Sequence, residues 1–216
     1  KRVGAYTDSV PPASSRPAHA MWSPPLGPRA VLVPVKAFGD AKGRLGSALG
    51  PAARIELARA MADRVLDAAV PLPVAVVCDD TQVAAWARRR RALVIWEPGR
   101  GLNGAVEAGV DHLTAAGVVH VTVAHADLPR AADLAQVGSD PGITLVPDRH
   151  GNGTNVIALP TGVGFRFSYG PGSFARHQIE AERLGVGVRI LHRPDLAWDV
   201  DEPDDVVAAA PASARR

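Results

Sequence analysis

Apolar and polar positions form two alternating patterns along the chain from Ala30 onward. Short runs that are almost wholly apolar alternate with longer segments in which apolar residues recur at three- and four-residue spacing. The first pattern predicts buried strands, and the second predicts helices with one buried face. We predict strands at Ala30–Val35, Val74–Cys78, Leu93–Trp96, His120–Ala124, Ile143–Val146, Asn155–Leu159 and Val188–Leu191. We predict helices at Pro51–Ala69, Thr81–Arg90, Asn103–Ala116, Ser173–Leu184 and Pro203–Ala210, with Thr81 as an N-cap.

This alternation predicts an α/β fold with one mostly parallel sheet covered by helices on both faces, in three layers. Residues 1–28 are rich in Pro, Ser, Ala and Arg without periodicity, so we expect a disordered leader there, or upstream sequence before a start near Met21. Residues 29–210 should form a single domain, and residues 211–216 a tail. We find no internal repeat and no second domain.

Composition narrows the class of protein. The 216 residues carry a formal net charge of +2, and the basic residues are dispersed, which argues against a nucleic-acid partner. No apolar run approaches the roughly 20 residues that span a bilayer, so we expect no membrane partner. The single cysteine, Cys78, cannot form an internal disulfide, which favours a reducing compartment such as the cytoplasm. The sequence leaves a homodimer open.

Ligands of parallel sheets bind beyond the carboxyl ends of the strands, so the residues after each strand matter. Pro34 lies at the end of the first predicted strand, and Lys36, Lys42 and Arg44 follow it, with glycines between them. Cations and closely approaching backbone amides are what a triphosphate needs. The loop lacks the GxxxxGK[ST] pattern of a Walker loop, and a solvated surface loop is the alternative.

Gly99–Gly104, after the third predicted strand, matches GxGxxG. That pattern favours a dinucleotide-dependent oxidoreductase when it follows the first strand, which it does not do here. A loop shaped around the base and ribose of a mononucleotide is our preferred interpretation, and a plain turn is the alternative.

Acidic residues follow two other strands. Asp127 comes just after the fourth strand, and Asp199 and Asp201 lie two apart in an extended segment, so their carboxylates should face the same side. Adjacent anions repel each other, and a divalent cation between them relieves the repulsion. We therefore predict that Asp127, Asp199 and Asp201 bind Mg²⁺ as in nucleotidyl-transfer sites. A helix cap and a solvated acidic turn are the alternatives.

Two further segments are rich in small hydrogen-bonding residues, Asp148–Asn155 and Tyr169–His177. The second opens a helix whose N-terminus would attract an anion, and Ser173 could cap that helix or bind a phosphate. We interpret His177 as structural, and no triad order with a partner acid indicates a hydrolase.

Together these motifs resemble the 2-phospho-L-lactate or phosphoenolpyruvate guanylyltransferase family of coenzyme F-420 biosynthesis. The resemblance covers about residues 30–207 and rests on motifs in the family's order: VPVKAFGDAKGRL, GLNGAVEAG, ADLP, DRHGNGTN, YGPGSFARH and DVDEPDD. It implies a Rossmann-like domain similar to that of molybdenum-cofactor guanylyltransferases. It also implies GTP as donor, a small phosphorylated carboxylic acid as acceptor, and release of pyrophosphate.

The resemblance also implies roles for individual residues. Asp127, Asp199 and Asp201 would hold Mg²⁺, with Thr154, Gly170 and Ser173 holding the acceptor acid. The nucleotide would lie near Pro34, Lys36, Lys42 and Asn103, with Lys42, Arg44 and Asp127 as catalytic residues. The Phe38–Asp40 loop receives no role.

Other activities stay open at this point. A sugar-1-phosphate or molybdopterin nucleotidyltransferase shares the fold, and a nucleotide-binding regulator would bind GTP without releasing pyrophosphate. Phosphoenolpyruvate, 2-phospho-L-lactate and 3-phosphoglycerate differ by a few atoms. The Ala- and Arg-rich composition suggests a bacterium with a high G+C content, where the resemblance favours phosphoenolpyruvate.

Overall fold

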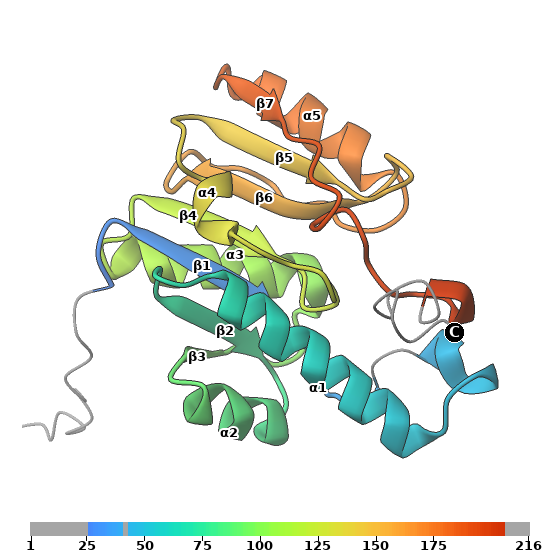
Figure 1. Cartoon of the computed structure of the whole chain (residues 1–216). Helices are drawn as coiled ribbons and strands as arrows, with labels where there is room; N and C mark the ends of the chain where they lie inside the picture. Colours follow the sequence, from blue (N-terminus) through green and yellow to red (C-terminus); the bar gives the residue numbers. More distant parts are fainter. Residues whose placement is uncertain (1–25, 41–42, 206–216) are drawn as a thin grey trace, which may run out of the picture.

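A computed structural model describes residues 26–40 and 43–205 of the chain (Figure 1). The predicted leader up to residue 25, Lys42, the last predicted helix from residue 206 on and the tail lie outside the described residues. Packing begins before residue 29, because Leu26 contacts the apolar core and the carbonyl of Pro28 accepts hydrogen bonds from the amides of Val119 and His120.

The described residues form one seven-stranded sheet in the order β3-β2-β1-β4-β6-β5-β7. Six strands run in one direction, and β6 is antiparallel to both of its neighbours, β4 and β5. The strands are β1 (Arg29–Pro34), β2 (Val74–Cys78), β3 (Leu93–Trp96), β4 (His120–Ala124), β5 (Ile143–Pro147), β6 (Thr154–Pro160) and β7 (Val188–Ile190).

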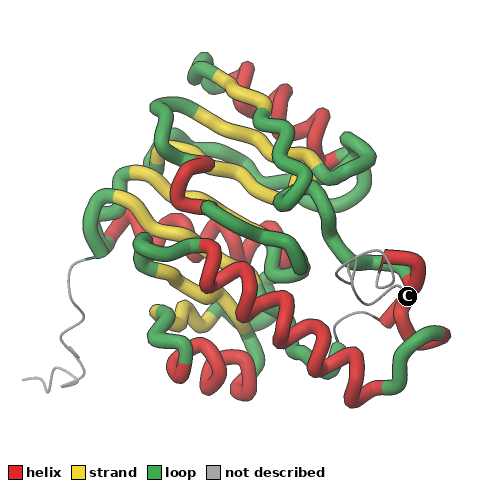
Figure 2. Tube along the Cα trace, in the orientation of Figure 1, coloured by secondary structure: helices red, strands yellow, loops and turns green. Residues whose placement is uncertain are grey.

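Helices cover both faces of the sheet, which gives three layers (Figure 2). Helices α1, α2 and α4 share one apolar cluster with the sheet, whereas α3 and α5 belong to the cluster on the opposite face. Their bounds are α1 (Pro51–Ala68), α2 (Thr81–Arg89), α3 (Gly101–Ala115), α4 (Leu134–Val137) and α5 (Ser173–Arg183), and a 3₁₀ helix, η1, spans Gly43–Ser47.

The alternation of side chains along β1 explains how one apolar strand supports both layers. Val31 and Val33 point into the cluster under α1, whereas Ala30 and Leu32 point into the cluster under α3. A strand with both faces buried needs apolar residues at every position, which is the pattern that predicted it. Helix α3 approaches β1 so closely that a Cβ atom at Gly109 would lie 2.7 Å from Cδ2 of Leu32.

The predicted strands and main helices are confirmed, with ends that shift by a residue or two. Two predicted caps are wrong. The side chain of Asp80, not Thr81, caps α2 by accepting a hydrogen bond from the amide of Val83 at 2.9 Å. The N-cap of α5 is Gly172, whose φ of 75° is left-handed, and Ser173 is the first residue inside the helix. Helices η1 and α4 were not predicted.

The reversal of β6 brings the start of this strand to the end of β4. Ala124 pairs with Val156, and the amide of His125 donates a hydrogen bond to the carbonyl of Asn155 at 3.0 Å. The loop before β6 therefore lies beside the residues that follow β4, at the carboxyl edge of the parallel strands.

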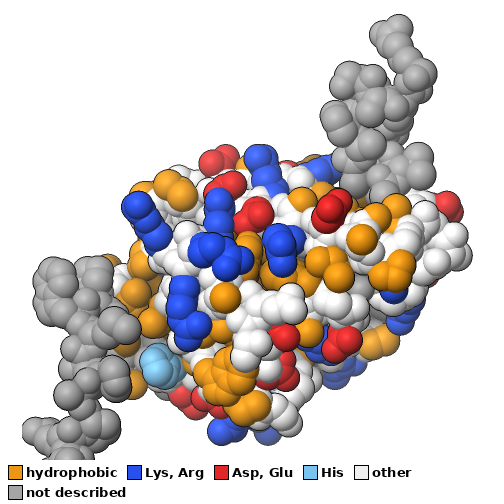
Figure 3. Space-filling view, turned by 90° about the horizontal axis from the view of Figure 1, so that it is seen from below, with side chains coloured by type: hydrophobic (Ala, Val, Ile, Leu, Met, Phe, Trp, Pro, Cys, Tyr) orange, Lys and Arg blue, Asp and Glu red, His pale blue; other side chains and the backbone are white. Residues whose placement is uncertain are grey.

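Basic residues at the α2 end of the molecule are mixed with other side chains. Figure 3 views the molecule from below in Figure 1, the side of α2 and β3, and shows Lys and Arg interspersed with acidic and apolar groups. Arg88–Arg91 are exposed at the end of α2, and Arg90 forms ion pairs with Asp63 and Asp67 of α1. Among the residues described, no helix is both long and apolar enough to cross a membrane.

The close approach of α3 to β1 predicts that Gly109→Ala destabilises the fold. Clash with Leu32 should cost about 1–3 kcal/mol, against a gain in helix propensity of about 1 kcal/mol. Urea denaturation should therefore give a net loss. Shortening the partner in the double variant Gly109→Ala, Leu32→Val should recover part of that loss, so the two changes should be non-additive. A more stable Gly109→Ala variant would contradict this packing.

Candidate active site

A cleft of about 350 Å³ opens at the carboxyl ends of β1 and β4. It is lined by Pro34, Val35, Lys36, Phe38, Asp40, Ala58, Met61, Leu102, His125, Ala126, Asp127 and Asp201. A smaller hollow of about 70 Å³ shares part of this wall and extends toward the ends of β2 and β3. It is lined by Pro34, Val35, Lys36, Val77, Cys78, Asp79, Glu97, Gly101, Leu102 and Ala105. The two hollows together form an elongated site at the edge where α/β sheets bind ligands.

Only some of the residues predicted to surround a nucleotide line the cleft. Pro34 and Lys36 line both hollows, and Lys36 is exposed and therefore accessible to an anion. Arg44 is exposed on η1 and is not among the residues that line the cleft. Lys42 lies outside the described residues, so its role and that of Arg44 stay predictions.

Asn103 connects two parts of the site. It lies in the first turn of α3, and its side-chain oxygen accepts a hydrogen bond from the amide of Tyr169 at 2.7 Å. This contact holds the loop before α5 against the helix that follows Gly101. A direct contact of Asn103 with a nucleotide stays a prediction.

The three predicted metal-binding aspartates come from two distant segments. Asp127 and Asp201 line the same cleft, and Asp199 lies near both. Burial raises the pKa of Asp199, and the negative charges of Asp127 and Asp201 raise it further, while Arg149 opposes this effect. Such mutual effects require the three carboxylates to lie within electrostatic range of one another.

The arrangement suits a divalent ion that also binds a substrate. Within residues 26–40 and 43–205, no three acidic, His or Cys side chains are close enough to form a complete metal site. Mg²⁺ usually takes one or two carboxylates together with substrate phosphates and water, so a complete protein cage is not required. Neighbouring carboxylates that repel each other, as Asp127 and Asp201 do with Asp199, are the kind of donor set that such an ion stabilises.

Apolar contacts fix the position of the acidic segment. Val200, between the two aspartates, is fully buried against Leu45 of η1 and Met61 of α1. In Figure 1 the C-terminal segment accordingly runs down toward η1 and the start of α1. Because Val200 points inward, its neighbours Asp199 and Asp201 are directed away from that apolar cluster.

The residues predicted to hold the acceptor acid are brought together in a second cluster. The hydroxyl of Ser173 accepts a hydrogen bond from the amide of Thr154 at 3.1 Å, and the amide of Ser173 donates to the carbonyl of Gly170 at 3.0 Å. Thr154 and Ser173 are 1% exposed, whereas Gly170 is exposed, with a φ of 116°. Glycine tolerates this left-handed backbone better than other residues.

His177 stabilises this cluster through hydrogen bonds of both its ring nitrogens. Its Nε2 accepts a hydrogen bond from the amide of Ser168 at 3.0 Å, which places the ring proton on Nδ1, 3.0 Å from Oγ1 of Thr154. Burial lowers the pKa of His177 to about 4, and the charge of Arg176 contributes. The imidazole is therefore neutral, and Thr154 keeps its own hydroxyl proton for another acceptor.

Aromatic rings join this cluster to the cleft. Tyr169 contacts the ring of His177 at 5.0 Å on one side and that of His125, which lines the cleft, at 4.8 Å on the other. Among the described residues, Nε2 of His125 and the hydroxyl of Tyr169 are buried without a hydrogen-bond partner. Sequence reasoning missed both residues, although His125 directly follows β4 and lies two positions before Asp127.

Sequence reasoning also assigned no role to Phe38 and Asp40, which line the cleft. Phe38 is 3% exposed and packs edge-on against Trp86 at 5.4 Å, with Arg59 over its ring. The presence of an aromatic residue inside a polar loop was the signal that could have identified Phe38 as a buried part of the cleft wall.

The loop before β6 folds around the carboxylate of Asp148. One oxygen accepts hydrogen bonds from the amides of His150 and Asn152, both at 2.9 Å, and the other accepts from Gly153 at 2.6 Å. A Cβ atom at Gly153 would lie 2.7 Å from that carboxylate, which explains why glycine occupies this position. Asn152 in turn accepts a hydrogen bond from the amide of Gly172, so the loop also supports the start of α5.

Solved structures share this architecture. The chain resembles a nucleotidyl transferase from Methanothermobacter thermautotrophicus with a TM-score of 0.61 and 15% identity, over 84% of this chain and 95% of the other. It also resembles 4-diphosphocytidyl-2C-methyl-D-erythritol synthase from Anaerococcus prevotii, with a TM-score of 0.55 and 10% identity, over 87% of this chain and 99% of the other. The fold is therefore that of nucleotidyltransferases.

Sequence comparison identifies the family to which the chain belongs within the nucleotidyltransferases. Residues 29–209 match the family model described as guanylyl transferase CofC like, and the chain belongs to this family. It is 37% identical over 184 residues to the phosphoenolpyruvate guanylyltransferase of Sphaerobacter thermophilus, covering 81% of this chain and 89% of the relative. It is 39% identical over 189 residues to that of Conexibacter woesei, covering 82% and 85%. The resemblance inferred from the motifs is confirmed.

The buried neutral His177 predicts acid sensitivity. Unfolded chains bind a proton at this ring below about pH 6.5, whereas the native protein does so only below about pH 4. Stability should therefore fall by roughly 3 kcal/mol as the pH drops from 6.5 to 4. Urea unfolding of His177→Gln should show a flatter pH dependence in this range, and His112→Gln, on the exposed face of α3, should not. Equal slopes in all three proteins would refute the assignment.

Proposed function

We propose that this protein is a phosphoenolpyruvate guanylyltransferase, which transfers GMP from GTP to the phosphate of phosphoenolpyruvate. The observation that carries the proposal is that Lys36, Asp127 and Asp201 line the same cleft. A cation and two acids at the carboxyl edge of a nucleotidyltransferase sheet fit a polyanionic substrate and its metal ion. The names of the bacterial relatives support the choice of acceptor.

The reaction exchanges one phosphoanhydride for another. An oxygen of the acceptor phosphate forms a bond to the α-phosphorus of GTP, and the bond from this phosphorus to the bridging oxygen breaks. The electron pair leaves with pyrophosphate. Because the acceptor phosphate is already an anion near neutral pH, no strong general base is needed. The barrier lies in bringing two polyanions together and in stabilising charge at the α-phosphorus.

The residues of the cleft address this barrier by charge and position. Lys36, exposed just after β1, would bind a phosphate of GTP, and we assign Lys42 and Arg44 as further cations for the triphosphate. Asp127, Asp199 and Asp201 would hold Mg²⁺. When bound, this ion supplies positive charge that offsets the repulsion between donor, acceptor and the carboxylates themselves.

We assign the base and ribose to the smaller hollow, where Gly101 and Leu102 open α3. The acceptor acid would bind beside Gly170, within reach of the cluster formed by Thr154 and Ser173. The hydroxyl of Thr154 receives its hydrogen bond from His177, so its own proton remains available to an anionic oxygen. Because Thr154 and Ser173 are buried, the acid would approach this cluster through the exposed backbone of Gly170.

The cellular setting is part of the same proposal. Cys78 is a free, buried thiol, which suits a reducing compartment, and we place the enzyme in the cytoplasm with a role in coenzyme F-420 biosynthesis.

A pyrophosphate-release assay tests the activity. The full chain with GTP and Mg²⁺ should release pyrophosphate with phosphoenolpyruvate at a higher kcat/KM than with 2-phospho-L-lactate or 3-phosphoglycerate, and mass spectrometry should detect the GMP adduct. CTP and ATP in place of GTP are the controls for the base. GTP binding without pyrophosphate release with any of the acids would instead indicate a regulator and would overturn the proposal.

The acidic residues of the cleft should be needed for turnover but not for folding. Asp127→Asn and Asp201→Asn should each lower kcat by on the order of 10²–10³, since each removes a preorganised charge contact. Thermal unfolding should change little. Asp111→Asn, on the exposed face of α3 away from this cleft, is the matched control and should retain turnover. Wild-type rates in Asp127→Asn and Asp201→Asn would reject the site.

A further inference from the structure

We propose that Arg149 and Asp205 are positioning residues that hold the acidic segment Asp199–Glu202 in its metal-binding conformation and thereby set the affinity for the divalent ion. The inference rests on the proposed function, because it concerns the same site. Both residues belong to motifs noted in the sequence, DRHGNGTN and DVDEPDD, and neither has a role in the mechanism above.

Asp205 fixes the turn that carries Asp201. One oxygen of its carboxylate accepts hydrogen bonds from the amides of Asp201 at 2.9 Å and Glu202 at 2.8 Å. The residue is 5% exposed, so this carboxylate needs polar partners. The two amide contacts fix the backbone at Asp201, whose side chain lines the cleft.

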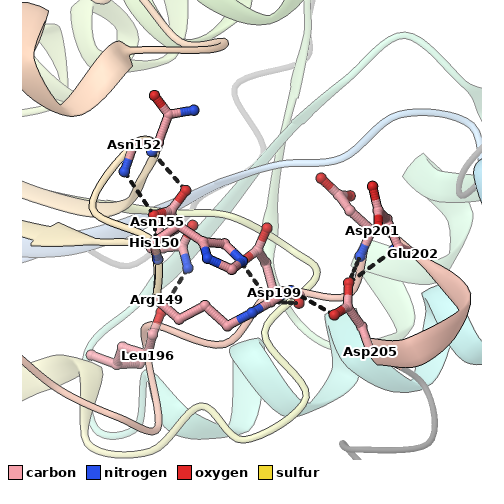
Figure 4. A network of polar contacts seen from close by, with 11 residues as sticks. Arg149, His150, Asn152, Asn155, Leu196, Asp199, Asp201, Glu202 and Asp205 are labelled. Atoms are coloured by element: carbon pink, nitrogen blue, oxygen red, sulfur yellow. Dashed lines mark hydrogen bonds and ion pairs between the residues drawn. The ribbon is translucent and has the colours of Figure 1, made fainter.

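Arg149 connects this turn to the rest of the segment. Its guanidinium bonds the second carboxylate oxygen of Asp205 at 2.5 Å and the carbonyl of Asp199 at 2.9 Å. It also forms an ion pair with the carboxylate of Asp199 at 3.5 Å. Figure 4 shows Arg149 reaching from the loop before β6 toward Asp199 and Asp205. A planar, forked cation can make these contacts simultaneously, whereas a lysine ammonium cannot reproduce their geometry.

Three further contacts hold the segment from its N-terminal side. The amide of Arg149 donates a hydrogen bond to the carbonyl of Ala197 at 2.8 Å. The ring of Trp198 is contacted by the guanidinium groups of both Arg130 and Arg149, each 4.5 Å from the ring centroid. The segment is therefore anchored at residues 197, 198, 199, 201, 202 and 205.

The same arginine belongs to the loop that supports the acceptor cluster. Its neighbour Asp148 organises the loop as far as Gly153, and Thr154 follows directly. Arg149 thus joins the segment with the metal-binding acids to the loop beside the acceptor site. Its positive charge also offsets part of the repulsion among the three carboxylates.

We call the contacts of Arg149 with Asp199 and Asp205 the clamp. Two substitutions distinguish the effect of the clamp from that of the turn formed by Asp201, Glu202 and Asp205. Asp205→Asn retains an oxygen that can accept the amides of Asp201 and Glu202, but it turns an amide NH₂ group toward Arg149. Arg149→Lys retains the charge and loses the fork. If the clamp sets metal affinity, both variants should weaken binding of Mn²⁺ in the presence of GTP by about 10-fold or more.

Binding is measured by electron paramagnetic resonance of free Mn²⁺, which requires no turnover. In the pyrophosphate assay, the Mg²⁺ concentration for half-maximal rate should rise by the same factor, and excess Mg²⁺ should restore most of kcat. Arg90→Lys, which alters an ion-pair network on α1 and α2 away from the cleft, is the control and should leave the Mn²⁺ affinity unchanged.

The outcomes are distinguishable. Unchanged Mn²⁺ affinity in both variants, with or without a lower melting temperature, would show that the clamp is only structural and would overturn the inference. Weakened Mn²⁺ binding in Asp205→Asn as well as in Arg149→Lys would support it. A wild-type protein that binds Mn²⁺ and GTP but releases no pyrophosphate would overturn the proposed function and leave the clamp supported or refuted by binding alone.

Discussion

Electrostatic repulsion is the constraint on which this site depends. Asp127, Asp199 and Asp201 converge at one edge of the sheet, and the substrates proposed for this edge are themselves polyanions. Such a gathering of negative charge is unfavourable unless the chain fixes it and cations offset it. The buried Val200 and the contacts of Arg149 fix the segment that carries Asp199 and Asp201, and the positive charge of Arg149 opposes the repulsion at Asp199.

Topology determines which segments meet at that edge. The loops that follow the parallel strands β1 and β4 lie at this edge, and they carry Lys36 and Asp127. Because β6 runs in the opposite direction, the loop that precedes it lies at this edge, and so does Thr154, the first residue of β6. The neutral His177 contacts Thr154 and accepts a hydrogen bond from the amide of Ser168. A charged imidazole could not accept that bond, because both of its nitrogens would carry protons.

Local patterns in the sequence predicted the elements well, since a strand buried on both faces must be apolar throughout. Strand direction was less accessible, because the apolar run of β6 looks the same in either orientation. The aspartates were predicted from their place after strands and from their two-residue spacing. Arg149 and Asp205 were not recognised, because their interaction joins positions far apart in sequence. His125 and Phe38 were missed because single aromatic residues in loops give no periodic signal.

The reversed strand also divides the molecule into two chemical halves. Residues before β5 line the cleft and the smaller hollow, apart from Asp201, whereas Thr154, Gly170 and Ser173 all lie between β5 and β7. Under the proposed function, substitutions between residues 148 and 177 would therefore act mainly on the acceptor, as long as they spare Arg149 and Tyr169, which contact Asp199 and Asn103. Under that proposal, such a sheet would give evolution, or an engineer, a route to new acceptors while the donor stays constant.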